Sequence, residues 1–386
     1  MTSAAHAFVP TSSPIRCQGN SFLQQPRRLS TRTMDELPLV VTDKVTSSTN
    51  PNSLLLNETA LIGVGRPEER HKFTLSQTFT RASTVAVIIA YIVNPQPFDD
   101  AIANVWSAIY NWGPAQQGLF EAEVASAGFF VSIAFFSILH LLLGEEKTKA
   151  ARLDGQMPVD PLSWTRPKDW YLWFNPLASY LGSIWIYQQF HERPPMPEVA
   201  PTFGVFSIEL LFGVFLYDLC FYPIHYLMHH SKFGKMRKVH GYHHRWSSHT
   251  LNSLETVQHS YIDGFLQVVV NIIVQHISPF GGPKHILSRL AHNIVVTYLL
   301  AEAHSGYNLP WMTHNIFPEF LGGSPRHDKH HHDGRVYYQQ YFKYLDDFFG
   351  FTDERIEEKK TKAKPNLKKH DEELIATQPK PLEVVV

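Results

Sequence analysis

Histidine is concentrated in one part of this 386-residue chain: 17 of its 22 histidines lie between His225 and His332, where even spacing would place about 6. Imidazole is both a metal ligand and a proton carrier at neutral pH. Three short patterns carry eight of these residues, one HxxxH and two HxxHH: His225 and His229; His240, His243 and His244; His327, His330 and His331. This segment therefore has the residue types and spacing of a metal site.

The spacing within each pattern suggests how the ligands are presented. Residues three and four apart share one face of a helix, so we expect each pattern to aim two or three imidazoles at one point. Eight histidines exceed the four ligands of tetrahedral zinc and the six of an octahedral ion. The sequence therefore predicts two metal ions.

Ligand type alone does not name the metal, because imidazole suits iron, zinc, copper and nickel alike. The surroundings of the histidine patterns narrow the choice of metal further. Histidine clusters beside apolar helices are placed to meet a lipid and to activate dioxygen, and oxidising a C–H bond or an isolated alkene requires a redox-active ion. This favours iron over zinc.

Composition and charge narrow the class of protein. The formal net charge is −1, so no overall positive field would attract nucleic acid. Hydrophobic residues make up 44% of the chain and charged residues 18%, against about 25% charged in typical soluble domains. Two cysteines, Cys17 and Cys220, cannot make a disulfide framework. The balance predicts a protein partly buried in a membrane.

Two charge-free runs of 21 residues, 124–144 and 170–190, each reach the roughly 20 residues that span a bilayer. A third run, 199–217, is interrupted only by Glu209, and the shorter runs 265–277 and 290–301 predict a hairpin that enters the membrane and returns. The run 82–93 is too short to assign. The core of a soluble helical protein is the alternative, but Trp and Tyr near the ends of the long runs favour membrane helices. We expect an all-α, multi-pass membrane protein with a cytosolic, histidine-rich helical di-metal domain.

The loops predict the orientation. Segment 145–169 holds five Lys or Arg residues, whereas 191–202 holds only Arg193, so the first loop is expected in the cytosol and the second in the lumen. The third helix then returns His225 to the cytosol. A hairpin over 261–301 would bring the last histidine pattern to the same side.

The chain ends differ from its centre. Residues 1–80 are rich in Ser, Thr, Pro, Asn and Gln and predict a disordered extension, and 353–386 predict a charged, solvated tail. The membrane-embedded catalytic domain is expected over 81–352. The first 34 residues hold four arginines and no acid, a bias shared by transit peptides and by basic disordered tails. A cleaved secretory signal is not expected, because no apolar run lies near Met1.

Over residues 203–352 the order HxxxH, HxxHH, HxxHH after apolar helices resembles the fatty acid hydroxylase / sterol desaturase superfamily of membrane di-iron oxygenases. The segments HYLMHH, HGYHH, AEAHSGYNLPW, HDKHH and YFKYLDDFFG, with Asp218, are similar to the sterol C-25 hydroxylase branch. The superfamily also includes alternative squalene epoxidases. The resemblance implies an endoplasmic reticulum membrane enzyme with two iron ions and O2 as co-substrate.

Carried over position by position, the resemblance implies nine catalytic metal ligands, namely His225, His229, His240, His243, His244, His304, His327, His330 and His331. Asn308 stands where some members have another histidine, which puts a complete histidine set in doubt there, although an amide oxygen can coordinate or hold a water. Arg326 directly precedes the final HxxHH pattern, at a position where close relatives often have a second histidine. We place it outside the ligand set.

The other histidines and nearby acids have plainer interpretations. Packing or hydrogen bonding is expected for His259, His276, His285 and His292, while His230, His249 and His332 adjoin the clusters but point off the shared face. Hydrogen bonds that orient ligands are expected from His314, Asp218, Glu302, Asp328 and Asp346.

The resemblance implies insertion of one oxygen atom from O2 into a lipid. The chain shows neither a GxGxxG fingerprint nor a haem-binding cytochrome b5 segment, so electrons from NAD(P)H are expected through a separate cytochrome b5 or reductase. Epoxidation of squalene to 2,3-oxidosqualene ranks slightly ahead of sterol side-chain hydroxylation, because the N-terminal extension, Asn308 and Arg326 depart from the ordinary hydroxylases. Sterol desaturation and fatty acid hydroxylation stay open.

A metal transporter or zinc-binding membrane scaffold is a competing hypothesis from another class. It predicts polar ligands distributed along the membrane helices. The long apolar helices contribute only His140 and Glu209, and the histidine patterns follow the third of them. This distribution favours the oxygenase.

Overall fold

The computed structural model describes residues 75–159, 171–190, 195–230, 234–246 and 249–355. The chain divides into two units, 1–50 and 51–386, and the first lies wholly outside the described residues. The same holds for most of the expected N-terminal extension and of the charged tail. The expected domain boundaries therefore stay predictions.

Helices make up the secondary structure of the described residues, which contain no strand. Two isolated bridges, Arg152 with Tyr307 and Leu321 with Phe342, are their only β pairings. The predicted all-α class is confirmed for this part of the chain.

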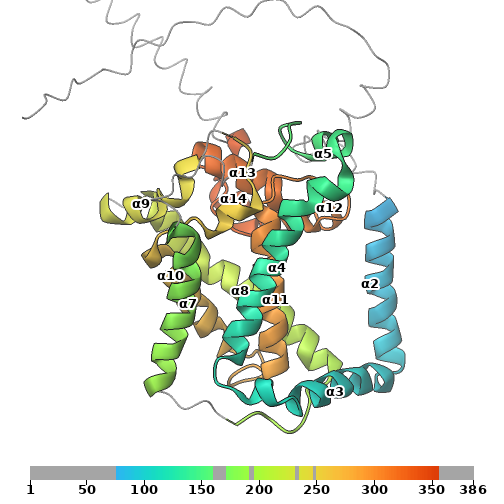
Figure 1. Cartoon of the computed structure of the whole chain (residues 1–386). Helices are drawn as coiled ribbons and strands as arrows, with labels where there is room; N and C mark the ends of the chain where they lie inside the picture. Colours follow the sequence, from blue (N-terminus) through green and yellow to red (C-terminus); the bar gives the residue numbers. More distant parts are fainter. Residues whose placement is uncertain (1–74, 160–170, 191–194, 231–233, 247–248, 356–386) are drawn as a thin grey trace, which may run out of the picture. The chain divides into compact units, whose positions relative to one another are not determined.

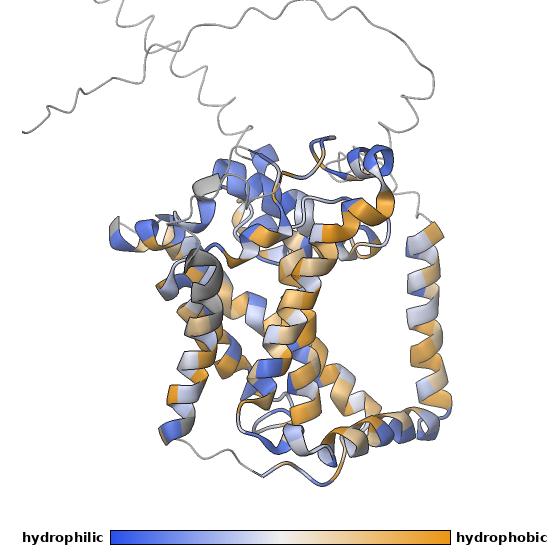
Figure 2. Cartoon of the chain, viewed as in Figure 1, coloured by the Kyte–Doolittle hydropathy of each residue, from blue (hydrophilic) through white to orange (hydrophobic). Residues whose placement is uncertain are grey.

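Two helices are long and apolar enough to cross a membrane, α4 (Phe120–Leu143) and α8 (Phe203–His230). Only 22% of the apolar window of α4 and 28% of that of α8 is buried inside the protein, whereas a core helix of a soluble protein is mostly buried. Figure 2 shows hydrophobic residues along these helices. Apolar surface left uncovered on this scale is what a bilayer would cover.

The remaining helices of the bundle match the predicted runs. The second run forms α7 (Tyr171–Phe190), and the predicted hairpin forms α10 (Tyr261–Gln275) and α11 (Ile286–Ala303). The unassigned run lies within α2 (Leu75–Val93), which α3 (Gln96–Tyr110) follows. Among the described residues α7 does not meet the criterion that α4 and α8 pass, so the number of crossings belongs to the proposal below.

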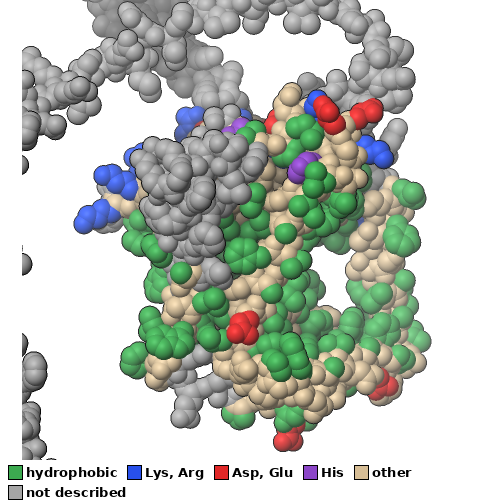
Figure 3. All heavy atoms as spheres, in the orientation of Figure 1, with side chains coloured by type: hydrophobic (Ala, Val, Ile, Leu, Met, Phe, Trp, Pro, Cys, Tyr) green, Lys and Arg blue, Asp and Glu red, His purple; other side chains and the backbone are tan. Residues whose placement is uncertain are grey.

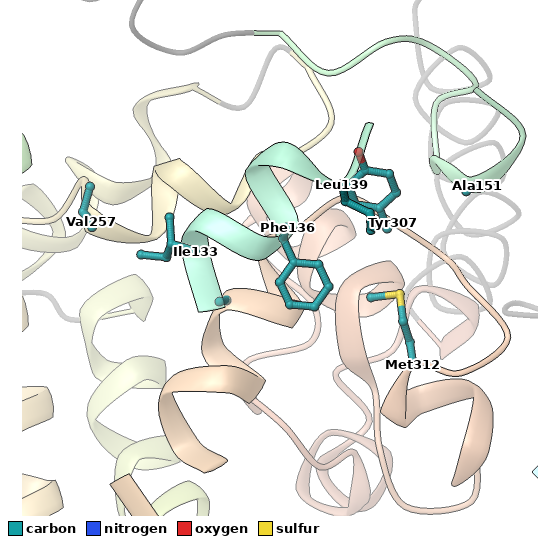
Figure 4. Packing of buried hydrophobic residues seen from close by; sticks show 8 residues of the cluster. Ile133, Phe136, Leu139, Ala151, Val257, Tyr307 and Met312 are labelled. Atoms are coloured by element: carbon teal, nitrogen blue, oxygen red, sulfur yellow. The ribbon is translucent and has the colours of Figure 1, made fainter. Parts of the chain in front are cut away.

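Helix α4 packs along α11, and a buried apolar cluster joins its C-terminal half to two other segments. In Figure 4 the α4 residues Ile133, Phe136 and Leu139 lie with Val257 of the 3-10 helix η5 (Ser253–Val257) and with Met312, which precedes α12 (Thr313–Ile316). Because these segments lie between histidine patterns in the chain, burial of their apolar side chains against α4 helps to fix the backbone that carries the site.

The histidine patterns gather at one end of the bundle, where α8 and α11 end and α10 begins (Figure 1). This end also carries the short helices α5 (Glu145–Ala151), α9 (Gly234–His240), α13 (Gly323–Asp333) and α14 (Tyr344–Phe349). Lys and Arg side chains appear on this end in Figure 3, whereas hydrophobic side chains cover much of the helices.

Arg152, in the loop expected in the cytosol, ties that loop to the histidine end. Its guanidinium is buried and donates to the carbonyl oxygens of Ser305 at 3.2 Å, Thr250 at 3.2 Å and Leu251 at 3.3 Å. The predicted basic loop and the histidine patterns therefore share one side of the bundle.

Candidate metal centre

Nine histidines converge in two groups, and they are the nine expected as ligands. Group one consists of His225, His229, His240, His244 and His330, and group two of His243, His304, His327 and His331. Within each group one ring nitrogen from every residue lies within 4.8 Å of the others. The four rings of group two are buried, and His229 and His244 of group one are half-buried. Their role as ligands is part of the proposal below.

Each HxxHH pattern is divided between the two groups, so the expectation that a pattern aims all its imidazoles at one point is wrong. On α13, His327 and His331 join group two, whereas His330 joins group one. Consecutive residues of a helix point about 100° apart around its axis, so the adjacent side chains of His330 and His331 diverge. This divergence allows one short helix to contribute to two centres.

The second HxxHH pattern is not one continuous helix. Helix α9 ends at His240, a turn follows, and His243 begins a short 3-10 helix, η4 (His243–Trp246). His240 and His244 nevertheless reach group one while His243 reaches group two. The pattern is therefore divided as on α13, by a different backbone path.

Hydrogen bonds fix which nitrogen of several rings faces its group. Nδ1 of His225 donates to the carbonyl oxygen of Tyr338 at 2.6 Å, and Nδ1 of His330 to that of Val336 at 2.7 Å. Nδ1 of His304 donates to the carbonyl oxygen of Leu300 at 2.8 Å. A neutral imidazole has one N–H, so in each of these rings Nε2 keeps a lone pair directed at the group.

The distances between these Nε2 atoms suit a shared metal ion. His225 and His330 are 3.1 Å apart, although neither Nε2 has a proton to donate. In group two His304 lies 3.0 Å from His243 and 2.9 Å from His327. Ligands at adjacent octahedral positions, about 2.1 Å from one metal, are separated by about 3.0 Å. In group one the buried Nε2 of His229 has no hydrogen-bond partner among the described residues, so it is also free to bind a metal. The donor set therefore fits a metal ion in each group.

Burial keeps these imidazoles in the neutral form that binds metals. Removal from water lowers the pKa of His304 to about 4. Burial, reinforced by neighbouring imidazoles, lowers the pKa well below the usual range for His240, His243, His244, His327, His330 and His331. Both groups thus present lone pairs at neutral pH.

A loop after α13 supplies the carbonyls of Val336 and Tyr338, and two buried carboxylates hold it. Asp218 of α8 accepts from the backbone N–H of Gln340 at 3.0 Å and of Tyr341 at 2.9 Å. Asp346 of α14 accepts from the N–H of Tyr338 at 2.9 Å and of Gln339 at 2.9 Å. Burial raises the pKa of Asp346 to about 7, against the effect of these hydrogen bonds. Both acids therefore act on the ligands through the loop and do not touch an imidazole of either group.

Asp263 orients a histidine directly, and the sequence analysis missed it. Its fully buried carboxylate accepts the Nδ1–H of His240 at 2.8 Å. A carboxylate behind a metal-binding histidine fixes the ring and makes it a stronger ligand. Its sequence context, SYIDG at the start of an apolar run, indicates only a helix N-terminus, where Ser260 accepts from the Asp263 N–H.

Asn308, where a further ligand was considered, belongs to neither group. Its amide oxygen accepts from Nε2 of His314 at 3.0 Å and from Asn315 at 2.6 Å. Glu302 accepts from the backbone N–H of Thr313 at 3.0 Å. Asn308, His314 and Glu302 therefore hold the loop after His304 in place.

The other candidates also lie outside both groups. Asp328 accepts from the N–H of Leu251 at 2.9 Å, and Arg326 pairs with Asp347 at 2.9 Å. His249 contacts Glu255, His332 contacts the carbonyl of Asp328, and His230 contacts the hydroxyl of Tyr338. The bond of His332 lies within α13, and the other interactions join separate parts of the chain, as expected for residues outside the ligand set.

Two pockets lie near the histidine groups. An apolar pocket lies among α4, α7, α10 and α11, and His259 and Gln267 are in its wall. Gln267 donates to Asp263, which in turn accepts from His240 of group one. The second pocket is a polar opening, and His229 and His244 of group one line it together with Arg237 and Arg335.

Comparison with known proteins agrees with this geometry. Residues 210–351 match the family model described as fatty acid hydroxylase, and this segment carries every histidine of both groups. The segment is therefore similar to the fatty acid hydroxylase family. Together with the relatives below, this confirms the resemblance to the fatty acid hydroxylase / sterol desaturase superfamily and its sterol hydroxylase-like branch.

The relatives are named for sterol chemistry. The chain is 30% identical to human cholesterol 25-hydroxylase over 158 residues, which are 40% of this chain. It is 29% identical to a cholesterol 25-hydroxylase-like protein of Caenorhabditis elegans over 180 residues, which are 47% of this chain. A Dictyostelium discoideum protein named provisionally as a methylsterol monooxygenase is 29% identical over 158 residues, 41% of this chain. The matches span 54–55% of these relatives' lengths. No solved structure matches the chain.

Proposed function

We propose that this protein is a membrane di-iron monooxygenase that transfers one oxygen atom from O2 to a sterol. The observation that carries the proposal is the arrangement of nine histidines in two groups. An apolar pocket is linked to group one through its wall residue Gln267, which donates to Asp263, the carboxylate that holds His240. All nine are proposed as ligands, with one iron ion in each group. Bound iron would supply the activation of O2, and the overall reaction consumes two electrons and two protons and releases water.

The residues of the chain have separate tasks in this reaction. The buried histidines and their carbonyl and carboxylate partners hold the ligand nitrogens before metal arrives, which limits reorganisation. The apolar helices exclude water and bring the lipid to the centre. Electrons from NAD(P)H through a cytochrome b5 or reductase are proposed to enter at the polar opening beside His229 and His244.

The substrate class rests on the relatives. Those described above are named for sterol hydroxylation or methylsterol oxidation and none of them for squalene. The sequence analysis ranked squalene epoxidation first. The relatives favour the alternative, sterol hydroxylation. We place the protein in the endoplasmic reticulum membrane as a multi-pass protein, with the histidine end in the cytosol, because the basic loop lies on that side.

The test is oxygen transfer by the full chain in detergent, loaded with iron and supplied with NADPH, cytochrome b5 and its reductase, 18O2 and one lipid at a time. Cholesterol, a 4-methylsterol and squalene are compared. We expect a sterol alcohol with one 18O atom, and none from His243→Ala. The matched control His276→Ala removes an exposed histidine whose ring hydrogen-bonds the carbonyl of Ile272 one turn earlier, and it should be active. If 2,3-oxidosqualene were the only product, squalene epoxidation would replace the proposed sterol oxygenation. If the iron-loaded protein oxygenated none of the three lipids, the proposal would be contradicted.

A further inference from the structure

Tyr338 has a fully buried side chain, and its role in the loop after α13 does not use the phenol. Its backbone carbonyl accepts from His225 and its backbone N–H donates to Asp346, and any residue except proline could supply these two groups. The preceding residue, Tyr337, has φ +55°, a conformation that few non-glycine residues adopt. The phenol that this loop places beside group one therefore needs an explanation of its own.

The ring of Tyr338 packs against three histidines of group one. Its centroid lies 5.4 Å from that of the His229 ring and 5.5 Å from that of the His330 ring. The third ring, that of His225, is 6.3 Å away and nearly perpendicular to the phenol. A single imidazole therefore separates the phenol from a metal ion bound in group one, which is a short path for an electron.

The hydroxyl of Tyr338 is directed at a proton acceptor. It forms a hydrogen bond with Nε2 of His230 and lies 3.3 Å from the carbonyl oxygen of Gly334. When the proton of His230 is on Nδ1, the lone pair of Nε2 accepts the phenol proton. His230 is itself exposed and lines the polar opening. The phenol thus lies between group one and the polar opening, with a base in contact with its hydroxyl.

This arrangement has the chemistry of a reversible electron donor. A phenol loses an electron more readily than an imidazole does, and more readily still when a base takes its proton in the same step. Group one consists of imidazoles, which a strongly oxidising metal would damage when no lipid is within reach. A phenol in contact with these rings would be oxidised in their place and could then be restored.

We propose that Tyr338 is a redox-active residue that protects histidine group one. When O2 has oxidised the iron of group one and no lipid is bound, the phenol gives the iron one electron and its proton moves to Nε2 of His230. A neutral tyrosyl radical remains, and the iron is reduced by one electron. One electron from the donor at the polar opening, with the proton returned by His230, restores the phenol. The inference rests on the proposed function for the iron and adds a reaction that consumes no lipid.

Freeze-quench EPR spectroscopy tests the electron donor. The iron-loaded full chain is reduced and mixed with O2 without lipid, and the wild type should give the signal of a tyrosyl radical, which narrows when the tyrosines carry ring deuterium. Tyr338→Phe keeps the ring and should lose the signal. The matched control is Tyr337→Phe at the neighbouring residue, whose hydroxyl bonds Asp353, and it should keep the signal. A radical that persists in Tyr338→Phe would overturn the assignment.

Two further readouts test the base and the protection. His230→Phe removes the proton acceptor and should lower the yield of the radical several-fold, and an unchanged yield would overturn the role of His230. Mass spectrometry after incubation with O2 and reductant, without lipid, should find several-fold more oxidised histidine of group one in Tyr338→Phe than in the wild type. Equal oxidation in the two proteins would overturn the protection.

The failure of this inference is distinguishable from that of the proposed function. A wild type that oxygenates a sterol but forms no radical without lipid would contradict only this inference. A radical on Tyr338 in a protein that oxygenates no lipid would contradict only the proposed function. Iron-loaded protein that shows neither result would contradict both.

Discussion

His330 and His331 are adjacent on α13, yet His330 belongs to histidine group one and His331 to group two. Nε2 of His330 lies 3.1 Å from that of His225, whereas Nε2 of His331 lies 3.2 Å from that of His327. The two candidate metal sites therefore share one short helix. A shift of α13 would disturb both at once.

Loss of one histidine from either group should stop the reaction. We expect His330→Ala and His243→Ala each to lower turnover by about 100-fold or more, because each removes a buried ligand and leaves the partner nitrogens unpaired. Membrane insertion should be unchanged, as shown by fractionation. The control is His332→Ala, which follows His331 and hydrogen-bonds its own helix. Near wild-type turnover in either ligand variant would remove the two-metal assignment.

The adjacent aspartates of α14 should differ sharply in their effect on stability. Asp346→Ala leaves the buried N–H groups of Tyr338 and Gln339 without an acceptor, at a cost of about 2–4 kcal/mol. Asp347→Ala removes a partly exposed pair with Arg326, worth less than about 1 kcal/mol. Thermal unfolding in detergent and iron retention are the measurements. Equal losses in the two variants would show that Asp346 does not hold the loop.

His249 and Glu255 should make stability depend on pH. Their hydrogen bond, 2.6 Å from Nε2 to Oε1, raises the pKa of His249 above its usual value. A histidine whose pKa is raised by folding contributes stability that is fully present below its unfolded pKa of about 6.5 and is lost as pH rises through the folded pKa. Between about pH 6 and pH 9 the wild type should lose more stability than His249→Gln. Parallel pH profiles for the two proteins would refute this link.

Two glycines with the same backbone conformation should tolerate alanine differently. Gly306 has φ +68°, and a Cβ there would lie 2.3 Å from the carbonyl oxygen of Leu251. Gly155 has φ +67°, but its nearest neighbour would be 4.0 Å away. Gly155→Ala should cost about 1–2 kcal/mol of backbone strain. Gly306→Ala must also displace the loop beside His304, so we expect little folded, iron-loaded protein, and wild-type yield would contradict the tight approach.

The sequence predicted the helices and the histidines well because both have local signals. Apolar runs marked α4, α8, α10 and α11 to within a few residues, except that α8 continues through His225 and His229. Spacing alone pointed to eight of the nine histidines, and the family resemblance added His304. The division of each HxxHH pattern was missed because it depends on where the facing helices lie, which the spacing of one helix does not contain.

The partners of the histidines were the least predictable feature. Backbone carbonyls of Val336, Tyr338 and Leu300 receive ligand N–H groups, and a carbonyl has no signature in residue type. Tyr337, between two of them, has φ +55°, a conformation that few non-glycine residues adopt and that the sequence does not suggest. Asp218 and Asp346 were expected to orient ligands directly, but they act through this loop.

The most direct test of the two-metal centre is the metal content of the full chain purified from cells grown with sufficient iron. The account predicts about two iron atoms per chain in the wild type. It also predicts a clear loss of iron in His330→Ala of group one and in His243→Ala of group two. One zinc ion per chain, with no oxygen consumption when lipid and reductant are added, would contradict the account and favour a metal-binding scaffold or transporter.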